Sequence, residues 1–192
     1  MLVTEPLDNL IFVVSEASSA GVDVVQWRDR TGEPKLQQET AQSLRRVMGT
    51  RSQLAVNICA PESTMIDSDW LHLPEAAIHE PKSIVHSNRV VGCSVHTVES
   101  AIAAESAGMS YIVAGTVFPS QSHPGAPGCG LPFLTQIVSS VKIPVIAIGG
   151  ISPENAKMCM EAGASGVAVL SGITRAKDIV RSVKLYRCAL DA

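Results

Sequence analysis

The stretch PVIAIGGISPENAKMCMEAGASGVAVL, residues 144–170, contains one complete unit of the fold. Uninterrupted apolar runs at 144–148 and 166–170 predict two strands that are buried on both faces. Between them, 153–162 has the features of a helix, with a proline near its start and a glycine directly after its end. A strand, a helix and a second strand in this order predict a βαβ unit with parallel strands.

The same unit recurs along the whole chain. Eight apolar runs predict strands, at 2–4, 22–27, 53–57, 71–73, 90–94, 111–114, 144–148 and 166–170. The longer segments of helical periodicity between and after them predict helices at 7–20, 35–48, 98–107, 131–141, 153–162 and 176–190. Eight such units predict an α/β fold of the (β/α)8 TIM barrel type, and a doubly wound open sheet is the alternative.

The length and composition limit what this fold can be. The 192 residues fit a single domain, 1–192, but they are few for a TIM barrel, so we expect short or missing helices after strands three and four, within 58–69 and 74–85. A chain that is 46% hydrophobic and 17% charged is expected to be globular. A net charge of −3 argues against nucleic acid as a partner, because phosphate backbones require a basic surface.

Other patterns exclude several further classes. Charged residues interrupt every apolar run before the roughly 18 residues that a membrane helix needs. Glu5 and Asp8 follow the first residue closely, so we expect no signal peptide and a cytoplasmic protein. None of the five cysteines forms a C-x-x-C pair, and no cluster of His, Asp and Glu follows a strand at metal-ligand spacing, so no metal site is expected.

Glycine turns follow the last two predicted strands, at the end of a barrel where active sites are built. Backbone N–H groups at such turns can approach an anion closely, and the start of a following helix adds positive partial charge. The residues that we expect to bind a phosphate here are Gly149, Gly150, Leu170, Ser171 and Gly172. The alternative is that the glycines only make tight turns.

Polar side chains at the ends of strands two and three could bind a second anion. Gln26, Arg28 and Arg30 alternate along the chain, so their side chains share one face. Two arginines on one face can hold a phosphate or diphosphate by paired hydrogen bonds, although salt bridges to acidic neighbours would explain them as well. Asn57 ends strand three and is either a ligand or a cap.

Two histidines are candidates for acid–base chemistry, because imidazole titrates near neutral pH. His96 follows strand five, two residues after Ser94. His123 lies in the Gly-, Pro- and Ser-rich stretch 118–130, and long loops of this kind are usually functional. His72 lies between two leucines within a strand, which favours a hydrogen-bonded core residue over a ligand.

Five short motifs stand out along the chain: Gln26-Trp-Arg-Asp-Arg30, Ser94-Val-His-Thr97, Gly115-Thr-Val-Phe-Pro119, Ala147-Ile-Gly-Gly-Ile151 and Val167-Ala-Val-Leu-Ser-Gly-Ile173. They occur in the order seen in the thiamine phosphate synthase/TenI superfamily. The sequence resembles this superfamily over essentially its whole length, most specifically from 90 to 173. The resemblance implies a barrel that acts in thiamine biosynthesis on a phosphorylated thiazole.

The resemblance implies one of two activities. The synthase joins a pyrimidine diphosphate to thiazole phosphate and releases diphosphate with the help of Mg²⁺. TenI-type tautomerases shift a proton to aromatise the thiazole carboxylate phosphate and need no metal. In the synthase, the strand-two motif and an Asn-Asp pair bind the diphosphate and Mg²⁺; here Asn57 matches the Asn, but Ile58 replaces the Asp.

Positions in the loop after strand six also differ from the superfamily pattern. The acid–base histidine of the best-known tautomerase falls at Thr116, and the loop lysine of the superfamily falls at His123. Ser120 and Ser122 keep the hydroxyl groups of that loop. The resemblance therefore implies that Thr116, Ser120 and Ser122 contact the substrate and that His123 or His96 moves the proton.

Taken together with these residues, the resemblance implies a metal-independent TenI-like thiazole tautomerase without a cofactor. One alternative is a Mg²⁺-dependent thiamine-phosphate synthase with a rebuilt metal site. Another is a paralogue that only binds a phosphorylated ligand. In each case the expected partner is a small phosphorylated thiazole, with no nucleic acid, no membrane and a possible homodimer.

Overall fold

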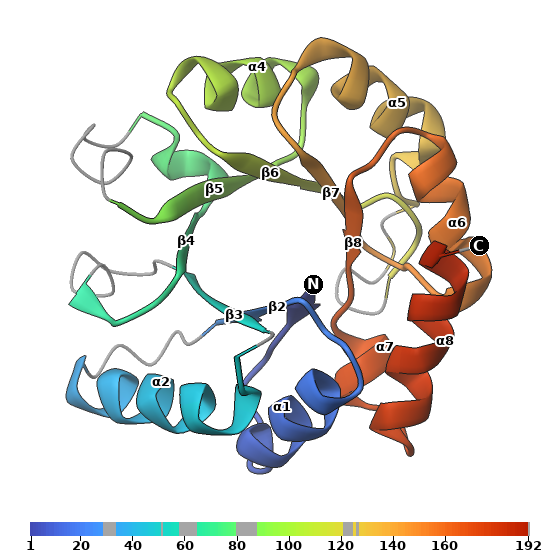
Figure 1. Ribbon diagram of the computed structural model, residues 1–192. Coiled ribbons are helices and arrows are strands. Elements are labelled where there is room, and N and C mark those ends of the chain that lie inside the picture. The colour runs from blue at the N-terminus through green and yellow to red at the C-terminus, as the bar shows by residue number, and fades with distance from the viewer. Residues whose placement is uncertain are drawn as a thin grey trace.

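Eight parallel strands form the centre of the molecule in a computed structural model that describes residues 1–28, 34–50, 52–57, 65–79, 88–120, 125 and 127–191. The strands hydrogen-bond in chain order (Figure 1). Their bounds are β1 (Leu2–Val3), β2 (Val24–Trp27), β3 (Gln53–Asn57), β4 (Trp70–Leu73), β5 (Val90–Val95), β6 (Tyr111–Gly115), β7 (Val145–Ile148) and β8 (Gly166–Ala168).

The sheet closes on itself between its first and last strands. Leu2 forms a parallel bridge with Val169, directly after β8. The Val3 N–H donates to the Val169 carbonyl at 2.9 Å, and the Val169 N–H donates to the Met1 carbonyl at 3.0 Å. The predicted (β/α)8 barrel is therefore confirmed over the open sheet that was its alternative.

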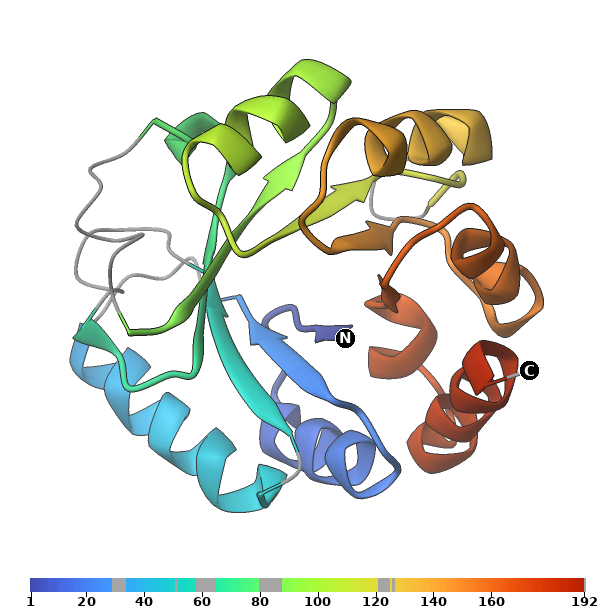
Figure 2. The ribbon, with the colours of Figure 1, turned by 45° about the horizontal axis from the view of Figure 1, so that its top comes forward.

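Helices surround this ring of strands (Figures 1 and 2). They are α1 (Leu10–Ser19), α2 (Pro34–Met48), α4 (Val98–Ser106), α5 (Gly130–Ser140), α6 (Pro153–Glu161), α7 (Ser171–Thr174) and α8 (Ile179–Asp191). After β4 the described residues form only the single 3-10 turn η2 (Glu75–Ala77), as expected for a lean barrel. Most of the segment after β3 lies outside the described residues. No helix in the described part is long and apolar enough to cross a membrane.

Two helix starts lie three residues later than the sequence predicts. The first helix begins at Leu10 rather than at residue 7, because Leu7 is the acceptor of a turn that precedes the helix. The last helix begins at Ile179 rather than at 176. The carboxylate of Asp178 accepts the N–H of Arg181 at 2.8 Å, the hydrogen bond of an N-cap residue, and this fixes the start of α8.

The described residues form two hydrophobic cores because strand side chains alternate between the two sides of the barrel wall. The larger core packs the helices against the outside of the sheet. The inner core includes Val3, Tyr111, Val113 and Ala168. Tyr111 fits there because it packs over Gly92, where an added Cβ would lie 2.3 Å from the ring.

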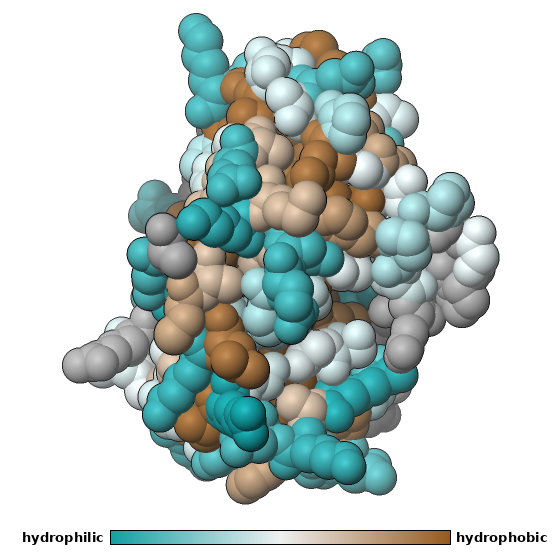
Figure 3. Space-filling view, turned by 90° about the vertical axis from the view of Figure 1, so that its right-hand side faces the viewer, coloured by the Kyte–Doolittle hydropathy of each residue, from teal (hydrophilic) through white to brown (hydrophobic). Residues whose placement is uncertain are grey.

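The outer surface over the last helices mixes polar and apolar side chains. Figure 3 views the side that carries α6 and α8, and hydrophobic areas there are small and interrupted by hydrophilic ones. Met158 on α6 and Leu185 on α8 are among the exposed large hydrophobic residues. Single exposed residues of this kind are normal on soluble domains and do not by themselves indicate a partner.

Candidate active site at the carboxyl ends of the strands

A buried polar network occupies the inside of the barrel below its carboxyl end. His72 is 1% exposed and places its Nδ1 3.0 Å from the Tyr111 hydroxyl and its Nε2 2.9 Å from the Ser94 hydroxyl. Burial, together with the positive charge of Arg28, lowers the pKa of His72 to about 3. The imidazole is therefore neutral near pH 7, and each ring nitrogen has a hydroxyl partner. This confirms the prediction of a hydrogen-bonded core histidine.

The strand-two motif begins at another buried polar residue. Gln26 is 4% exposed, and its Nε2 contacts the Met1 sulfur at 3.8 Å. The Arg28 N–H donates to the Thr4 hydroxyl at 3.2 Å, and the charge of Arg28 is close enough to affect His72. The third member of the motif, Arg30, lies outside the described residues.

Asn57 lies at the same level of the barrel as the histidine. It ends β3, and it is the direct strand partner of His72 in the parallel ladder between β3 and β4. Its side chain is half-buried. Asn57 and Ser94 therefore lie on the two strands that flank β4, and Ser94 is two residues further along β5 than Gly92, the strand partner of His72.

His96 is paired with a carboxylate that the sequence analysis did not select. Its Nδ1 lies 2.6 Å from Glu75 Oε2, and its backbone N–H donates to Glu75 Oε1 at 3.2 Å. The pKa of Glu75 is lowered: partial burial raises it, but hydrogen bonds from Ser100 and His96 outweigh that effect. In a neutral imidazole, a proton on Nδ1 completes the bond to the carboxylate and leaves Nε2 as an acceptor. The His96 side chain is 60% exposed.

The segment after β6 is fixed against the end of β7. The N–H groups of Val117 and Phe118 donate to the carbonyls of Ile148 and Gly149 at 2.9 and 3.0 Å. The Thr116 carbonyl accepts the N–H of Cys129 at 2.8 Å, which ties the far end of the loop back to its start.

The hydroxyl groups of this loop are only partly described. The buried Oγ of Ser120 has no hydrogen-bond partner within the described ranges. The candidates Ser122 and His123 lie outside those ranges, so their predicted roles stay predictions.

Gly149 and Gly150 have backbone conformations that disfavour any side chain, with φ of 103° and 62°. An added Cβ at Gly149 would lie 2.3 Å from Cγ2 of Thr116, and one at Gly150 would lie 2.3 Å from the Pro119 carbonyl. The turn after β7 packs so tightly against the loop after β6 that this packing alone explains why both positions are glycine. Whether they also hold a phosphate stays a prediction.

The glycine after β8 lies in a different setting from the one expected. Leu170 precedes α7, and Ser171 and Gly172 are the first two residues of this four-residue helix, which is separate from the final helix. We expected this turn to lie ahead of the final helix; instead it begins a separate short helix, and residues 175–178 separate α7 from α8. Gly172 is required because an added Cβ would lie 2.3 Å from the Tyr186 hydroxyl.

Three side chains from α6 and α8 hold the carbonyl groups of these two loops, and the sequence analysis did not assign them this role. The Asn155 amide donates to the Gly150 carbonyl at 3.1 Å. The Tyr186 hydroxyl donates to the Ile151 carbonyl at 2.9 Å, and the Ser182 hydroxyl donates to Gly172 at 2.7 Å. A capping-box pattern signals Asn155, but no sequence pattern marks the other two.

Metal ligands are scarce at this end of the barrel. Within the described residues, no three side chains of His, Cys, Asp or Glu come together as a metal site would require. The carboxylate of Glu75 lies at the site but is already bonded to His96. The described residues therefore contain no closed set of protein ligands, although Mg²⁺ is usually held by only one or two carboxylates together with substrate phosphates.

A parallel eight-stranded barrel with polar groups gathered at its carboxyl end has the general design of a TIM-barrel enzyme. Residues 1–173 match the family model described as thiamine monophosphate synthase. This chain belongs to that family.

Individual relatives agree with this assignment. The chain is 33% identical over 186 residues to a thiamine-phosphate synthase of Nitrosococcus oceani, covering 95% of this chain and 86% of the relative. It is 36% identical over 174 residues to one of Natronomonas pharaonis, covering 86% and 80%. A solved thiamine phosphate pyrophosphorylase of Pyrococcus furiosus superposes with a TM-score of 0.84 at 30% identity, covering 99% of this chain and 94% of that one.

Proposed function

We propose that this protein is a thiamine-phosphate synthase, which joins a phosphorylated thiazole to a pyrimidine diphosphate with release of diphosphate. The observation that supports this best is the similarity to relatives named thiamine-phosphate synthase along most of both chains. It favours the synthase, the alternative of our sequence analysis, over the tautomerase that we predicted first.

The proposal gives each part of the barrel end a role. The phosphate of the thiazole is held by backbone groups of Gly149 and Gly150 and of Ser171 and Gly172, since glycine turns after the last two strands let N–H groups approach an anion. The pyrimidine diphosphate is held by Arg28 together with Gln26 and Asn57, because guanidinium groups bind phosphate oxygens in pairs. The synthases that the sequence resembles use Mg²⁺, and because the described residues show no closed set of protein ligands for the ion, no step is assigned to it.

A thiazole tautomerase is the second candidate, and the pair of Glu75 and His96 favours it. The hydrogen bond between the Glu75 carboxylate and His96 Nδ1 favours the imidazole tautomer whose Nε2 can accept a proton. Cys93 and Val95 pack in the outer core, while Ser94 bonds to His72 inside. By the same alternation, His96 continues the inward-facing series at the open end of the barrel.

A parallel assay of both reactions, with and without EDTA, separates the candidates. For the synthase we expect diphosphate release that requires both substrates and that stops when EDTA removes Mg²⁺. The tautomerase would instead turn over the thiazole carboxylate phosphate in excess EDTA, and His96→Ala or His123→Ala would lower kcat about 100-fold or more. Binding of thiazole phosphate without either turnover would contradict both and leave the non-catalytic alternative.

A further inference from the structure

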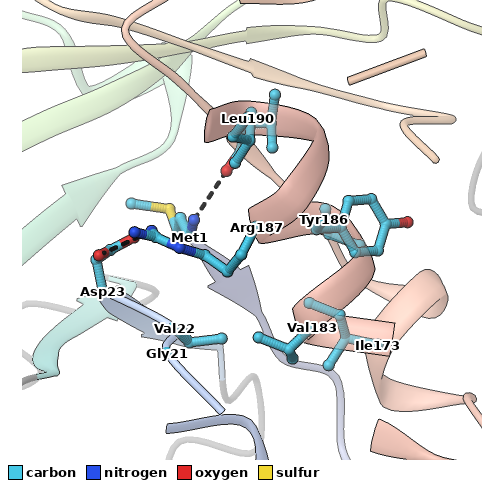
Figure 4. A pocket seen from close by; sticks show the side chains of 11 residues that line it. Met1, Gly21, Val22, Asp23, Ile173, Val183, Tyr186, Arg187 and Leu190 are labelled. Carbon is cyan, nitrogen blue, oxygen red and sulfur yellow. Dashed lines mark hydrogen bonds and ion pairs between the residues drawn. The ribbon is translucent and has the colours of Figure 1, made fainter. Parts of the chain in front are cut away.

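Tyr186 on α8 lies beneath the two loops that follow β7 and β8. Its side chain is 5% exposed, and its hydroxyl donates to the Ile151 carbonyl at 2.9 Å. The ring lines a small cavity of about 30 Å³ with Val183 and Ile173, and the hydroxyl points away from the other labelled residues of that cavity (Figure 4). This volume is enough for one or two water molecules but not for a substrate.

The same hydroxyl also packs against the loop after β8. An added Cβ at Gly172 would lie 2.3 Å from the Tyr186 oxygen, so the absence of a side chain at Gly172 makes room for it. One turn earlier on α8, Ser182 donates to the Gly172 carbonyl at 2.7 Å. A single helix therefore contacts both loops through hydroxyl groups.

These contacts determine the orientation of the peptide groups in the β7 turn. Tyr186 binds the Ile151 carbonyl, while the N–H of the same peptide group, on Ser152, donates to Asn155 at 2.8 Å. The Asn155 amide also binds the Gly150 carbonyl, and in a planar trans peptide the following N–H, on Ile151, points the opposite way. Burial, with a smaller effect of Glu154, raises the pKa of Tyr186 to about 12, so its hydroxyl stays a donor near neutral pH.

We propose that Tyr186 is a positioning residue that sets the spacing between the Gly149–Gly150 turn and the Ser171–Gly172 segment, and thereby the affinity of the site for a phosphoryl group. This inference rests on the proposed function, which assigns the phosphate of the substrate to these two loops. Tyr186 itself contacts no substrate; it acts through the Ile151 carbonyl and through its contact with Gly172.

The direct test is Tyr186→Phe, which removes the hydroxyl and keeps the ring. We expect the Kd for the phosphorylated thiazole, measured by calorimetry, to rise roughly tenfold, the effect of losing about one buried hydrogen bond. The Kd for the same thiazole without its phosphate should not change, and kcat at saturating substrate should stay within about twofold of the wild type, since the effect is on binding. Ser139→Ala is the matched control, because it removes an exposed hydroxyl that bonds a carbonyl within α5.

A second pair of variants tests the contact with Gly172. Gly172→Ala should weaken phosphate binding strongly, because the new methyl group meets the Tyr186 oxygen. Adding Tyr186→Phe removes that oxygen, and the nearest remaining atoms are then Cγ1 of Val169 at 3.1 Å and the ring Cζ at 3.3 Å, which are close but do not overlap the methyl group as the oxygen does. The double variant should therefore bind the phosphorylated thiazole more tightly than Gly172→Ala alone.

The outcomes separate the two proposals. If the wild-type protein does not distinguish the phosphorylated thiazole from the unphosphorylated one, the phosphate site and this inference both fail. If the wild type does distinguish them and Tyr186→Phe keeps the same ratio of affinities, only the role of Tyr186 is wrong. If Tyr186→Phe lowers the affinity for the phosphorylated and the unphosphorylated thiazole equally and also lowers the Tm, the positioning role of Tyr186 is wrong as well. That result would indicate a general loss of structure.

Discussion

At the residue scale, the inside of the barrel holds a histidine that cannot easily take up a proton. His72 is buried between the hydroxyls of Tyr111 and Ser94, and Arg28 adds positive charge nearby. Its side chain is therefore part of the folded core at neutral pH, although histidine is often the titrating group of an active site. At the open end, His96 is exposed and paired with Glu75, so the two histidines lie in contrasting surroundings.

The low pKa of His72 predicts how stability depends on pH. In the unfolded chain a histidine takes up a proton below about pH 6.5, but folded His72 does so only near pH 3. The contribution of His72 is therefore fully present above pH 6.5 and is lost as the pH falls from there towards 3. Where the unfolded chain binds one proton more than the folded protein, the free energy of unfolding falls by about 1.4 kcal/mol for each pH unit of acidification.

Urea unfolding of the wild type and of His72→Gln at pH 7, 6 and 5 measures this effect. The glutamine amide keeps a donor and an acceptor but does not titrate. We expect the variant to be less stable at pH 7 and to lose about 1 kcal/mol less than the wild type between pH 6 and pH 5. Parallel pH profiles for the two proteins would show that His72 is not buried in its neutral form.

At the element scale, the turn after β7 is limited by its contacts as well as by its backbone angles. Gly150 and Gly49 have nearly the same φ, 62° and 67°. An added Cβ at Gly150 would meet the Pro119 carbonyl, whereas nothing lies within 4 Å of the same position at Gly49. Comparing substitutions at these two glycines therefore distinguishes the cost of backbone strain, which both share, from the cost of steric overlap, which only Gly150 has.

Alanine substitutions at these two glycines should have very different effects. Gly49→Ala introduces only the strain of a left-handed alanine, about 1 kcal/mol. Gly150→Ala adds the overlap with the β6 loop, and we expect a total loss of about 3 kcal/mol or more in the free energy of unfolding. Denaturant titrations of both variants provide the comparison; equal losses would mean that the β6 loop moves freely away from the turn.

At the scale of the whole molecule, a two-residue strand closes the barrel. β1 pairs with β2 on one side, and Leu2 bridges Val169 on the other. The Leu2 side chain is completely buried in the outer core, so closure of the sheet and packing of the helices depend on the same residue. Because all the strands belong to one sheet, loss of this closure is expected to affect the whole barrel.

Leu2→Ala tests this dependence, with Leu36→Ala as its control. Removing a fully buried leucine side chain costs about 2–5 kcal/mol, whereas Leu36 is 50% exposed and its loss should cost about 1 kcal/mol or less. Tryptophan fluorescence and circular dichroism should report the same urea midpoint for each variant if the barrel unfolds as one unit. Separate midpoints in Leu2→Ala would show that part of the sheet survives without closure.

Much of this protein could be predicted from the sequence because the signals are local. Alternating apolar runs and helical segments are determined by near neighbours, and they predicted eight strands, the barrel and the lean region after β4. Motifs such as Ala147-Ile-Gly-Gly-Ile151 also indicated the family. The helix boundaries were less accurate, because the cap at Asp178 and the separate helix α7 depend on a few specific hydrogen bonds.

The contacts around the candidate site were decided only by the tertiary structure. Glu75 and His96 are 21 positions apart in the chain, and Ile151 and Tyr186 are 35 apart, so no local pattern could pair them. The sequence by itself determined the order of the elements and the end of the barrel where polar groups gather. Folding determined which of those groups meet, because closing the sheet brings together side chains from distant strands and from the helices packed outside them.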